Sequence, residues 1–444
     1  MASNADILKT KFTNLSAKIG VIGLGYVGLP LLLAYHSRGF CTYGFDIDEN
    51  KISLLNNGES YIKHIQNHNL KSGISDGTII PTADFSKIND VDALMICVPT
   101  PLDIEKNPDL SYIISTANEI KSYLRSSQLI ILESTTYPGT TREILKPILE
   151  ESGLKSGTDI YIAFSPERED PGNAKFTTKN IPKVVGGDGI VARDLTCSLY
   201  DKICTRTVPV SSLEVAEGVK LTENIFRAVN IAMINELKII YDKMGIDVWE
   251  VIDAAKSKPF GYMPFYPGPG LGGHCIPIDP FYLSFRAKQF GQDTKFIKLA
   301  GELNTHMPHY VLDILKKAMS EKLSLVLSNS KVLIVGVAYK KNIDDTRESP
   351  GFVIMDLLEN LGVRVDYYDP LITEISNTRG HPALVGRKSI KWSRKNISQY
   401  DAALICTDHD VIDYEKLVTY SKLVVDTRNA TASFTDSQFK IVKA

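Results

Sequence analysis

The sequence has no marked excess of either charge and no long apolar run. Its 50 Lys and Arg residues nearly balance 52 Asp and Glu residues, for a formal charge of −2. Nucleic acid and anionic membranes are therefore not expected partners. The first residues contain no continuous apolar segment, so we expect no signal peptide. The most apolar stretch, residues 21–35, is too short and too rich in glycine to span a bilayer.

The sequence also lacks any paired cysteine motif. Its six cysteines stand at positions 41, 97, 197, 204, 275 and 406, with no Cys-x-x-Cys pair among them. This spacing indicates neither a disulfide framework nor a zinc site, and no metal is expected. A reducing cytoplasm is the compartment that fits best. At 444 residues the chain is too long for one compact core, so two or three domains are expected.

A complete dinucleotide-binding pattern lies near the start of the chain. An apolar run typical of a buried parallel strand enters Gly23-Leu-Gly25-Tyr-Val-Gly28, and a second apolar strand ends at Asp46. Gly23 permits a tight turn, Gly25 lets the backbone approach a pyrophosphate, and Gly28 lets the helix pack on the strand. The phosphates would lie at the N-terminus of the following helix, facing its free amide groups.

The acid after the second strand bears on the choice of cofactor. Asp46 would accept hydrogen bonds from a ribose diol and would repel a 2′-phosphate, so NAD is expected rather than NADP. Lys51 follows closely and keeps that preference open, although a solvated helix position also explains this lysine.

Small polar residues follow three further predicted strands. These segments are Pro99-Thr100-Pro101, Ser134-Thr135-Thr136 and Ser165-Pro-Glu167-Arg168. Ligands bind at the carboxyl ends of strands in open parallel sheets, although ordinary loop polarity would explain any one segment. Glu167 is therefore a candidate acid–base or water-positioning group, and Arg168 is a candidate anion clamp.

A long helix is predicted in the middle of the chain. Ser211 to Glu214 has the capping-box pattern, and apolar residues recur at helical spacing as far as Met244. The helix would have about nine turns and would be apolar on more than one side, which suits a subunit interface. Lys220 and Asn224 share one face of it. Such polar groups need partners if they are buried, although a solvated helix edge explains them equally well.

This helix is followed by the segment Tyr266-Pro-Gly-Pro-Gly-Leu-Gly272-Gly-His-Cys275-Ile-Pro-Ile-Asp279. Its prolines and glycines exclude a regular helix or a central strand. A stiff loop of this kind suits a site that wraps a ligand and presents the thiol of Cys275. Taken alone, the segment fits a surface turn with an inert cysteine equally well.

The last third of the chain repeats the alternation of strands and helices, without the glycine fingerprint. A helix is expected to begin near Pro350, and strands are expected to end at Asp369, Thr407 and Asp426. We therefore predict an α/β fold of two Rossmann-like, doubly wound parallel-sheet domains, joined by the long helix and a small helical domain. The expected boundaries are 1–210 for the dinucleotide-binding domain, 211–320 for the helical domain with the thiol loop (the segment from Tyr266 to Asp279), and 321–444 for the second Rossmann-like domain.

Together these motifs resemble the UDP-glucose/GDP-mannose dehydrogenase family over nearly the whole chain. The matching stretches are Gly23 to Pro30, Val98 to Pro101, Glu133 to Thr135, Phe164 to Arg168, Lys220 to Asn224, Gly272 to Asp279, and Tyr339-Lys340 through Arg347-Glu-Ser. His274 and Ile278 stand where the UDP-glucose branch usually has an aromatic residue and a lysine. The resemblance is therefore to the UDP-N-acetylhexosamine branch, and the run from Phe164 to Gly172 leans toward UDP-N-acetylglucosamine.

The resemblance implies a reaction and a set of catalytic residues. The C6 alcohol of the sugar would be oxidised to a carboxylate by two NAD molecules in succession, through a thiohemiacetal and a thioester on Cys275. Lys220 would stabilise the developing oxyanion. Asn224 and Asp279 would position the water or take protons, with Thr135 and Glu167 assisting.

The resemblance also implies binding residues. With the three fingerprint glycines Gly23, Gly25 and Gly28, the expected NAD contacts are Tyr26, Val27, Asp46, Lys51, Thr100, Thr135 and Arg347. The expected contacts to the nucleotide sugar are Arg168, Glu169, Lys220, Asn224, Arg227, Tyr266, Gly272, Tyr339 and Lys340.

The expected function is thus oxidation of UDP-N-acetylglucosamine at C6 by a cytoplasmic homodimer or higher homo-oligomer, for surface polysaccharide synthesis. UDP-N-acetylmannosamine and UDP-glucose are alternative substrates. A hypothesis of another class is an inactive regulator that binds NAD and a nucleotide sugar. Cys275, Lys220 and Asp279 together argue against the regulator, because a sensor has no need of a thiol.

Overall fold

The computed structural model describes residues 3–62, 65–103, 105, 107–168, 180–273, 276–376, 378 and 380–444. The chain forms two compact units. The first comprises Met1–Glu223 and Phe281–Gln292, and the second comprises Asn224–Pro280 and Asp293–Ala444. Each unit has its own β-sheet. Among the described residues, no helix is long and apolar enough to cross a membrane.

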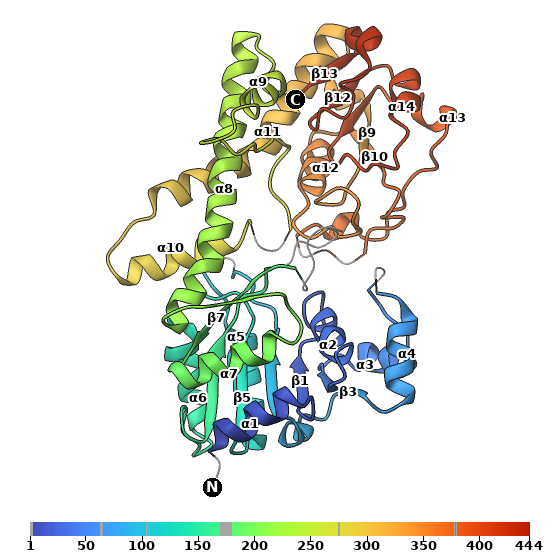
Figure 1. The fold of residues 1–444 in the computed structure, drawn as a ribbon. Helices are drawn as coiled ribbons and strands as arrows, with labels where there is room; N and C mark the ends of the chain where they lie inside the picture. Colours follow the sequence, from blue (N-terminus) through green and yellow to red (C-terminus); the bar gives the residue numbers. More distant parts are fainter. Residues whose placement is uncertain are drawn as a thin grey trace. The chain divides into compact units, whose positions relative to one another are not determined.

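The first unit is built on an eight-stranded sheet in the order β3-β2-β1-β4-β5-β6-β7-β8 (Figure 1). The strands are β1 Lys18–Ile22, β2 Cys41–Phe45, β3 Ile79–Thr82, β4 Ala93–Ile96, β5 Gln128–Leu132, β6 Ile160–Phe164, β7 Lys183–Gly187 and β8 Thr207–Pro209. Neighbouring strands pair in parallel except β6 and β7, which pair antiparallel with Ala163 opposite Gly187. The order of strands reverses between β1 and β4, and ligands bind at such a switch point in open α/β sheets.

Helices cover this sheet and bury its apolar strands. They are α1 Asn4–Thr13, α2 Gly28–His36, α3 Glu49–Asn56, α4 Asn67–Ser75, α5 Ser111–Ile120, α6 Lys146–Glu150 and α7 Ile190–Tyr200. Phe12 of α1, Tyr35 of α2 and Leu199 of α7 share one core with Val21 and Met95 of the sheet. Every residue of β4, β5 and β6 is buried, which explains why these strands read as continuous apolar runs.

The second unit has a five-stranded, wholly parallel sheet in the order β10-β9-β11-β12-β13. Its elements are α9 Val248–Ala255, α11 Lys295–Leu323, β9 Lys331–Val335, α12 Pro350–Asn360, β10 Arg364–Tyr368, α13 Arg394–Ile397, β11 Ala402–Ile405, α14 Tyr414–Tyr420, β12 Val424–Asp426 and β13 Ile441–Lys443. Leu315 of α11 and Phe352 of α12 pack with Ile334 in one core. Leu417 of α14 packs with Val335 in another.

The predicted long helix is α8, Leu213–Met244, and α10, Asp279–Gln289, comes after α9. The predicted end of α8 is confirmed, since Gly245 has a φ of +72°. The predicted cap is wrong by one residue. The hydroxyl of Ser212, rather than that of Ser211, accepts the amide of Val215 at 3.3 Å. The two doubly wound units and the long helix are as predicted, whereas the domain boundaries at 210 and 320 stay a prediction.

Candidate active site

The glycine turn between β1 and α2 has the geometry that a dinucleotide requires. Gly23 has a φ of +85°, and a Cβ there would lie 2.6 Å from the carbonyl of Cys97, while one at Gly28 would lie 2.0 Å from the carbonyl of Gly23. A Cβ at Gly25 would meet nothing within 4 Å, so the turn is open on that side. The N-cap of α2, Val27, makes no side-chain cap hydrogen bond. No cap side chain competes with a phosphate for the first-turn amides, and the turn therefore fits NAD.

Asp46 lies beside this turn at the end of β2. One carboxylate oxygen accepts the amide of Leu24 at 2.9 Å and the ammonium of Lys51 at 3.2 Å, and the other accepts the amide of Asp48 at 3.0 Å. The ammonium of Lys51 also lies 5.9 Å from the centroid of the Tyr61 ring. Lys51 is therefore an ion-pair partner of the predicted ribose acid rather than only a solvated helix residue.

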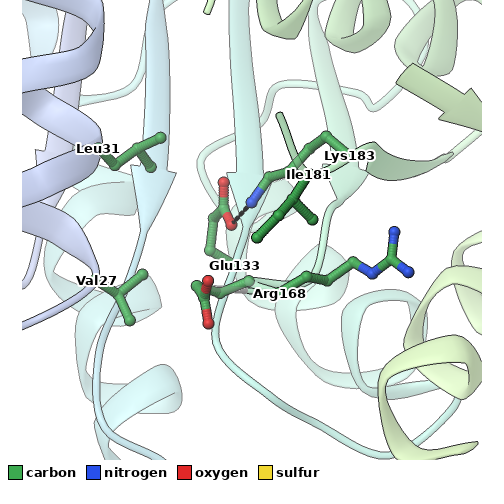
Figure 2. A pocket seen from close by; sticks show the side chains of 7 residues that line it. Val27, Leu31, Glu133, Arg168, Ile181 and Lys183 are labelled. Carbon is green, nitrogen blue, oxygen red and sulfur yellow. Dashed lines mark hydrogen bonds and ion pairs between the residues drawn. The ribbon is translucent and has the colours of Figure 1, made fainter. Parts of the chain in front are cut away.

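A small cavity of about 20 Å³ lies beside the same helix. Its lining residues are Val27, Leu31, Glu133, Glu167, Arg168, Ile181 and Lys183. Figure 2 shows Val27 and Leu31 on one side of the cavity and the paired side chains of Glu133 and Lys183 on the other. The cavity therefore lies between α2, the carboxyl end of β5 and the start of β7.

The first turns of α8 bring Lys220 to Glu167 in the first unit. The Lys220 side chain is 7% exposed, and its ammonium donates to the carbonyl of Glu167 at 2.5 Å and lies 3.8 Å from the Glu167 carboxylate. A nearly dry, fixed positive charge is suited to a developing oxyanion. The neighbouring Arg168 pairs with Glu223 at 2.5 Å and donates to the carbonyl of Pro182 at 2.7 Å. Arg168, which we predicted as an anion clamp, thus binds a carboxylate and a carbonyl of the protein itself.

In the second unit, Asn224 and Asp279 form a buried pair. The amide nitrogen of Asn224 donates to the carboxylate of Asp279 at 2.5 Å, and the two residues are 3% and 1% exposed. This contact fixes the orientation of a carboxylate at the first residue of α10. Arg227 is exposed on α8, and Tyr266 stacks on Trp249 with ring centroids 5.7 Å apart, so neither belongs to the buried pair.

The glycines of the thiol loop allow close contact with the segment after β9. The amide of Gly273 donates to the carbonyl of Arg347 at 2.9 Å, and Gly273 has a φ of +85°. A Cβ at Gly272 would lie 2.7 Å from the Tyr339 side chain and 2.8 Å from the carbonyl of Glu348. These two glycines therefore serve protein packing, a role that the sequence analysis did not assign to them.

The remaining predicted residues differ in their surroundings. Cys275, Glu169 and His274 lie outside the described residues. Tyr26 is 39% exposed and Thr100 is 3% exposed, while Thr135 and Lys340 are half-buried. The guanidinium of Arg347 pairs with the carboxylate of Asp345 at 2.6 Å.

Three family models match successive segments of the chain. They describe the NAD binding domain of the UDP-glucose/GDP-mannose dehydrogenase family over residues 17–204, its central domain over 214–306 and its UDP binding domain over 333–433. The chain belongs to this family. It is therefore an NAD-dependent dehydrogenase of a UDP-sugar, and the predicted family, fold and cofactor are confirmed.

Individual members of the family are similar over most of their length. The UDP-N-acetyl-D-glucosamine 6-dehydrogenase of Pseudomonas aeruginosa is 37% identical over 80% of this chain and 83% of its own. The solved UDP-D-ManNAc dehydrogenase of Pyrococcus horikoshii is 32% identical, with a TM-score of 0.82 over 93% of this chain and 96% of its own. The solved NDP-N-acetyl-D-galactosaminuronic acid dehydrogenase of Methanosarcina mazei Go1 is 28% identical, with a TM-score of 0.80 over 100% of this chain and 98% of its own.

One candidate binding residue of this family member was missed in the sequence. Arg428 follows β12, and its side chain donates to the carbonyl of Cys406 at 2.9 Å. A Cβ at Gly268 of the thiol loop would lie 2.6 Å from its guanidinium. Burial lowers the pKa of Arg428, while nearby Asp408 counteracts that shift. The usable signal was its place after Asp426, at the carboxyl end of a parallel strand.

Proposed function

We propose that this chain oxidises UDP-N-acetylglucosamine at C6 to the corresponding uronic acid, for surface polysaccharide synthesis. The supporting observation is the burial of Lys220 against Glu167, with 3.8 Å between ammonium and carboxylate. Each oxidation step develops negative charge on the C6 oxygen, and a fixed cation in a dry site stabilises that charge. NAD, when bound, would accept one hydride from C6 in each of two successive oxidations.

A covalent step separates the two oxidations. The first converts the C6 alcohol to an aldehyde, with loss of a hydride and a proton. The thiolate of Cys275 then forms a C–S bond to the aldehyde carbon, and the carbonyl oxygen takes a proton to give a thiohemiacetal. A second loss of hydride and proton gives a thioester. Water adds to the thioester carbon, and the C–S bond breaks to release the carboxylate and regenerate the thiol.

Four other side chains have proposed roles in proton transfer and hydrolysis. Asn224 and Asp279 would orient the attacking water or take its proton, with Thr135 and Glu167 assisting. The 2.5 Å contact between Asn224 and Asp279 supports this role, because a buried carboxylate held by an amide has a defined direction for accepting a proton.

The choice of sugar rests on resemblance. Relatives named for UDP-N-acetylglucosamine support the leading substrate. A relative named for UDP-N-acetylmannosamine, that of P. horikoshii, is 32% identical over 93% of the chain and supports the second candidate. Values of kcat/KM for these two sugars and for UDP-glucose decide the question. A higher kcat/KM for UDP-N-acetylmannosamine or UDP-glucose would reject the leading substrate.

Two measurements test the reaction itself. Purified protein should form two NADH per sugar oxidised, and one NADH per sugar would refute the double oxidation. Cys275→Ala should bind NAD and the UDP-sugar normally but form no uronic acid. Turnover to uronic acid at the wild-type rate by this variant would refute the covalent role. No NADH formation by the wild-type protein with any UDP-sugar would instead favour a binding regulator.

We also propose a cytoplasmic homodimer that uses α8. Phe226, Met233 and Ile240 recur every seven residues in the second unit and are 48%, 46% and 44% exposed. Residues at this spacing fall along one stripe of a helix, and a second copy of the chain would remove that stripe from water. Light scattering of the purified protein should give twice the mass of one chain, and a monomer would reject this interface.

A further inference from the structure

Two lysines from different elements bind successive carbonyls of the turn after β6. The ammonium of Lys183, at the start of β7, donates to the carbonyl of Pro166 at 3.3 Å. The ammonium of Lys220, on α8, donates to the carbonyl of Glu167 at 2.5 Å. Each end of the Pro166–Glu167 segment is therefore fixed by a charged donor, and such hydrogen bonds are stronger than neutral ones.

Lys183 is itself held by a buried carboxylate. Glu133 follows β5, its side chain is 0% exposed, and it accepts hydrogen bonds from the Lys183 ammonium and the Tyr200 hydroxyl. Figure 2 shows the contact between Glu133 and Lys183. Burial raises the pKa of Glu133, and the charge and hydrogen bond of Lys183 counteract that rise. A continuous polar chain thus runs from Tyr200 through Glu133 and Lys183 to the turn that carries Glu167.

This arrangement is poorly explained by stability alone. The desolvation cost of a buried ion pair commonly equals or exceeds its Coulomb gain, and well-packed apolar residues serve a core as well or better. What an apolar pair cannot do is bind the carbonyl of Pro166. The lysine side chain is 11% exposed and lines the cavity that Glu167 also lines, so the pair borders the candidate site rather than the bulk core.

We propose that Glu133 and Lys183 are positioning residues for the reaction. They hold the Pro166–Glu167 turn in place. The position of that turn sets the distance between the Glu167 carboxylate and the Lys220 ammonium. This inference rests on the proposed roles of Glu167 and Lys220. Neither Glu133 nor Lys183 is assigned a contact with the sugar or the cofactor.

The test is Lys183→Met, which keeps the length of the side chain and removes its donor. Misplacing a catalytic group by about 1 Å can cost about 100-fold in rate, so we expect kcat to fall by about that factor. Dissociation constants for NAD and for UDP-N-acetylglucosamine, measured by fluorescence titration and calorimetry, should stay within about threefold of wild type because no binding contact is removed. The kcat–pH profile should also be displaced, because the spacing of Glu167 and Lys220 changes.

The matched control is Lys146→Met. Lys146 pairs with Asp188 at 2.8 Å in the same unit, and both of these side chains are at least as exposed as the corresponding members of the Glu133–Lys183 pair. This variant loses a lysine and an ion pair but leaves the Pro166–Glu167 turn intact. Its kcat and its pH profile should match those of the wild type.

A double variant keeps the test valid if Lys183→Met alone fails to fold. Glu133→Gln with Lys183→Met leaves no unpaired buried charge, and the amide oxygen of the introduced glutamine still offers Tyr200 an acceptor. A folded double variant should lose kcat as Lys183→Met does. Wild-type kcat in either folded variant, or an equal loss in the Lys146→Met control, would overturn the positioning role. Wild-type protein that oxidises no UDP-sugar would instead refute the proposed function.

Discussion

Replacing Asp46 by Asn should convert an NAD-selective enzyme into one that discriminates weakly between NAD and NADP. The substitution changes one atom and one charge. It keeps one oxygen, which can still accept the amide of Leu24 at 2.9 Å, but it turns an NH2 group toward the amide of Asp48, which the other oxygen of Asp46 now accepts at 3.0 Å. It also removes the carboxylate that holds the ammonium of Lys51 at 3.2 Å. A positive group would then lie beside the ribose position without its counter-charge.

The magnitude follows from two effects. A hydrogen bond to an ionised acceptor is about twice as strong as a neutral one, a difference of about 1 to 1.5 kcal/mol for the ribose diol. Affinity for NAD should therefore fall by about tenfold. A 2′-phosphate loses the repulsion of Asp46 and gains the attraction of Lys51, which should raise kcat/KM for NADP by at least about tenfold. The ratio of kcat/KM for NAD over NADP should thus fall by about 100-fold.

The assay is initial-rate NADH or NADPH formation with a saturating UDP-sugar. Asp48→Asn is the control, because it removes the same charge two residues away. The Asp48 side chain caps α3 by accepting the amide of Asn50 at 3.0 Å, and Asn is an equally good cap. That control should leave both kcat/KM values within about twofold of wild type. If Asp46→Asn changes the ratio by less than about threefold, the assignment of Asp46 to the ribose is wrong.

Two further predictions concern charged groups of the first unit. Lys220→Met should lower kcat by about 100- to 1000-fold with a smaller change in NAD affinity, and a loss below about tenfold in steady-state assays would contradict its oxyanion role. Burial raises the pKa of Glu217 to about 7 despite hydrogen bonds from Thr141 and Gly139. Its contribution to stability is therefore complete below pH about 4.5 and is lost as the pH rises through about 7, by about 3 kcal/mol. The thermal midpoint of wild type should fall more steeply than that of Glu217→Gln between pH about 5 and 8, and parallel curves would contradict the shift.

The sequence predicted the elements whose signal is local. Strands β1, β2, β4, β5 and β6 are apolar runs buried on both faces, so each was recognisable without knowledge of its neighbours. Strand β7 was missed because only Val184 and Val185 are apolar in its five residues, and nothing in those residues predicts its antiparallel pairing with the preceding strand β6. The cap of α8 was placed one residue early because Ser211 and Ser212 are adjacent, and both suit the cap position.

The candidate site was predictable only as far as it follows strand ends and helical spacing. Glu167 was predicted as a site residue because ligands bind at the carboxyl ends of parallel strands. The contact between Glu133 and Lys183 spans 50 residues of sequence and depends on where β7 enters the sheet. No local sequence pattern predicts where β7 pairs in the sheet. The same holds for the contact between Asn224 and Asp279, which are 55 residues apart and belong to separate helices.

The two sheets place an acid at equivalent points, but with opposite consequences. Asp46 accepts three donors, whereas Asp369, after β10, accepts amides of residues 337, 338, 371 and 372 and Nε2 of His409 at 3.1 Å. The amide of Asn342 donates to Nδ1 of His409, so Nε2 carries the proton toward Asp369. Five donors exceed the roughly four lone-pair sites of a carboxylate, so Asp369 has no capacity for a ribose diol. The acid of the second sheet therefore fixes the loops around it, whereas Asp46 keeps acceptor capacity for the ribose that we predict it binds.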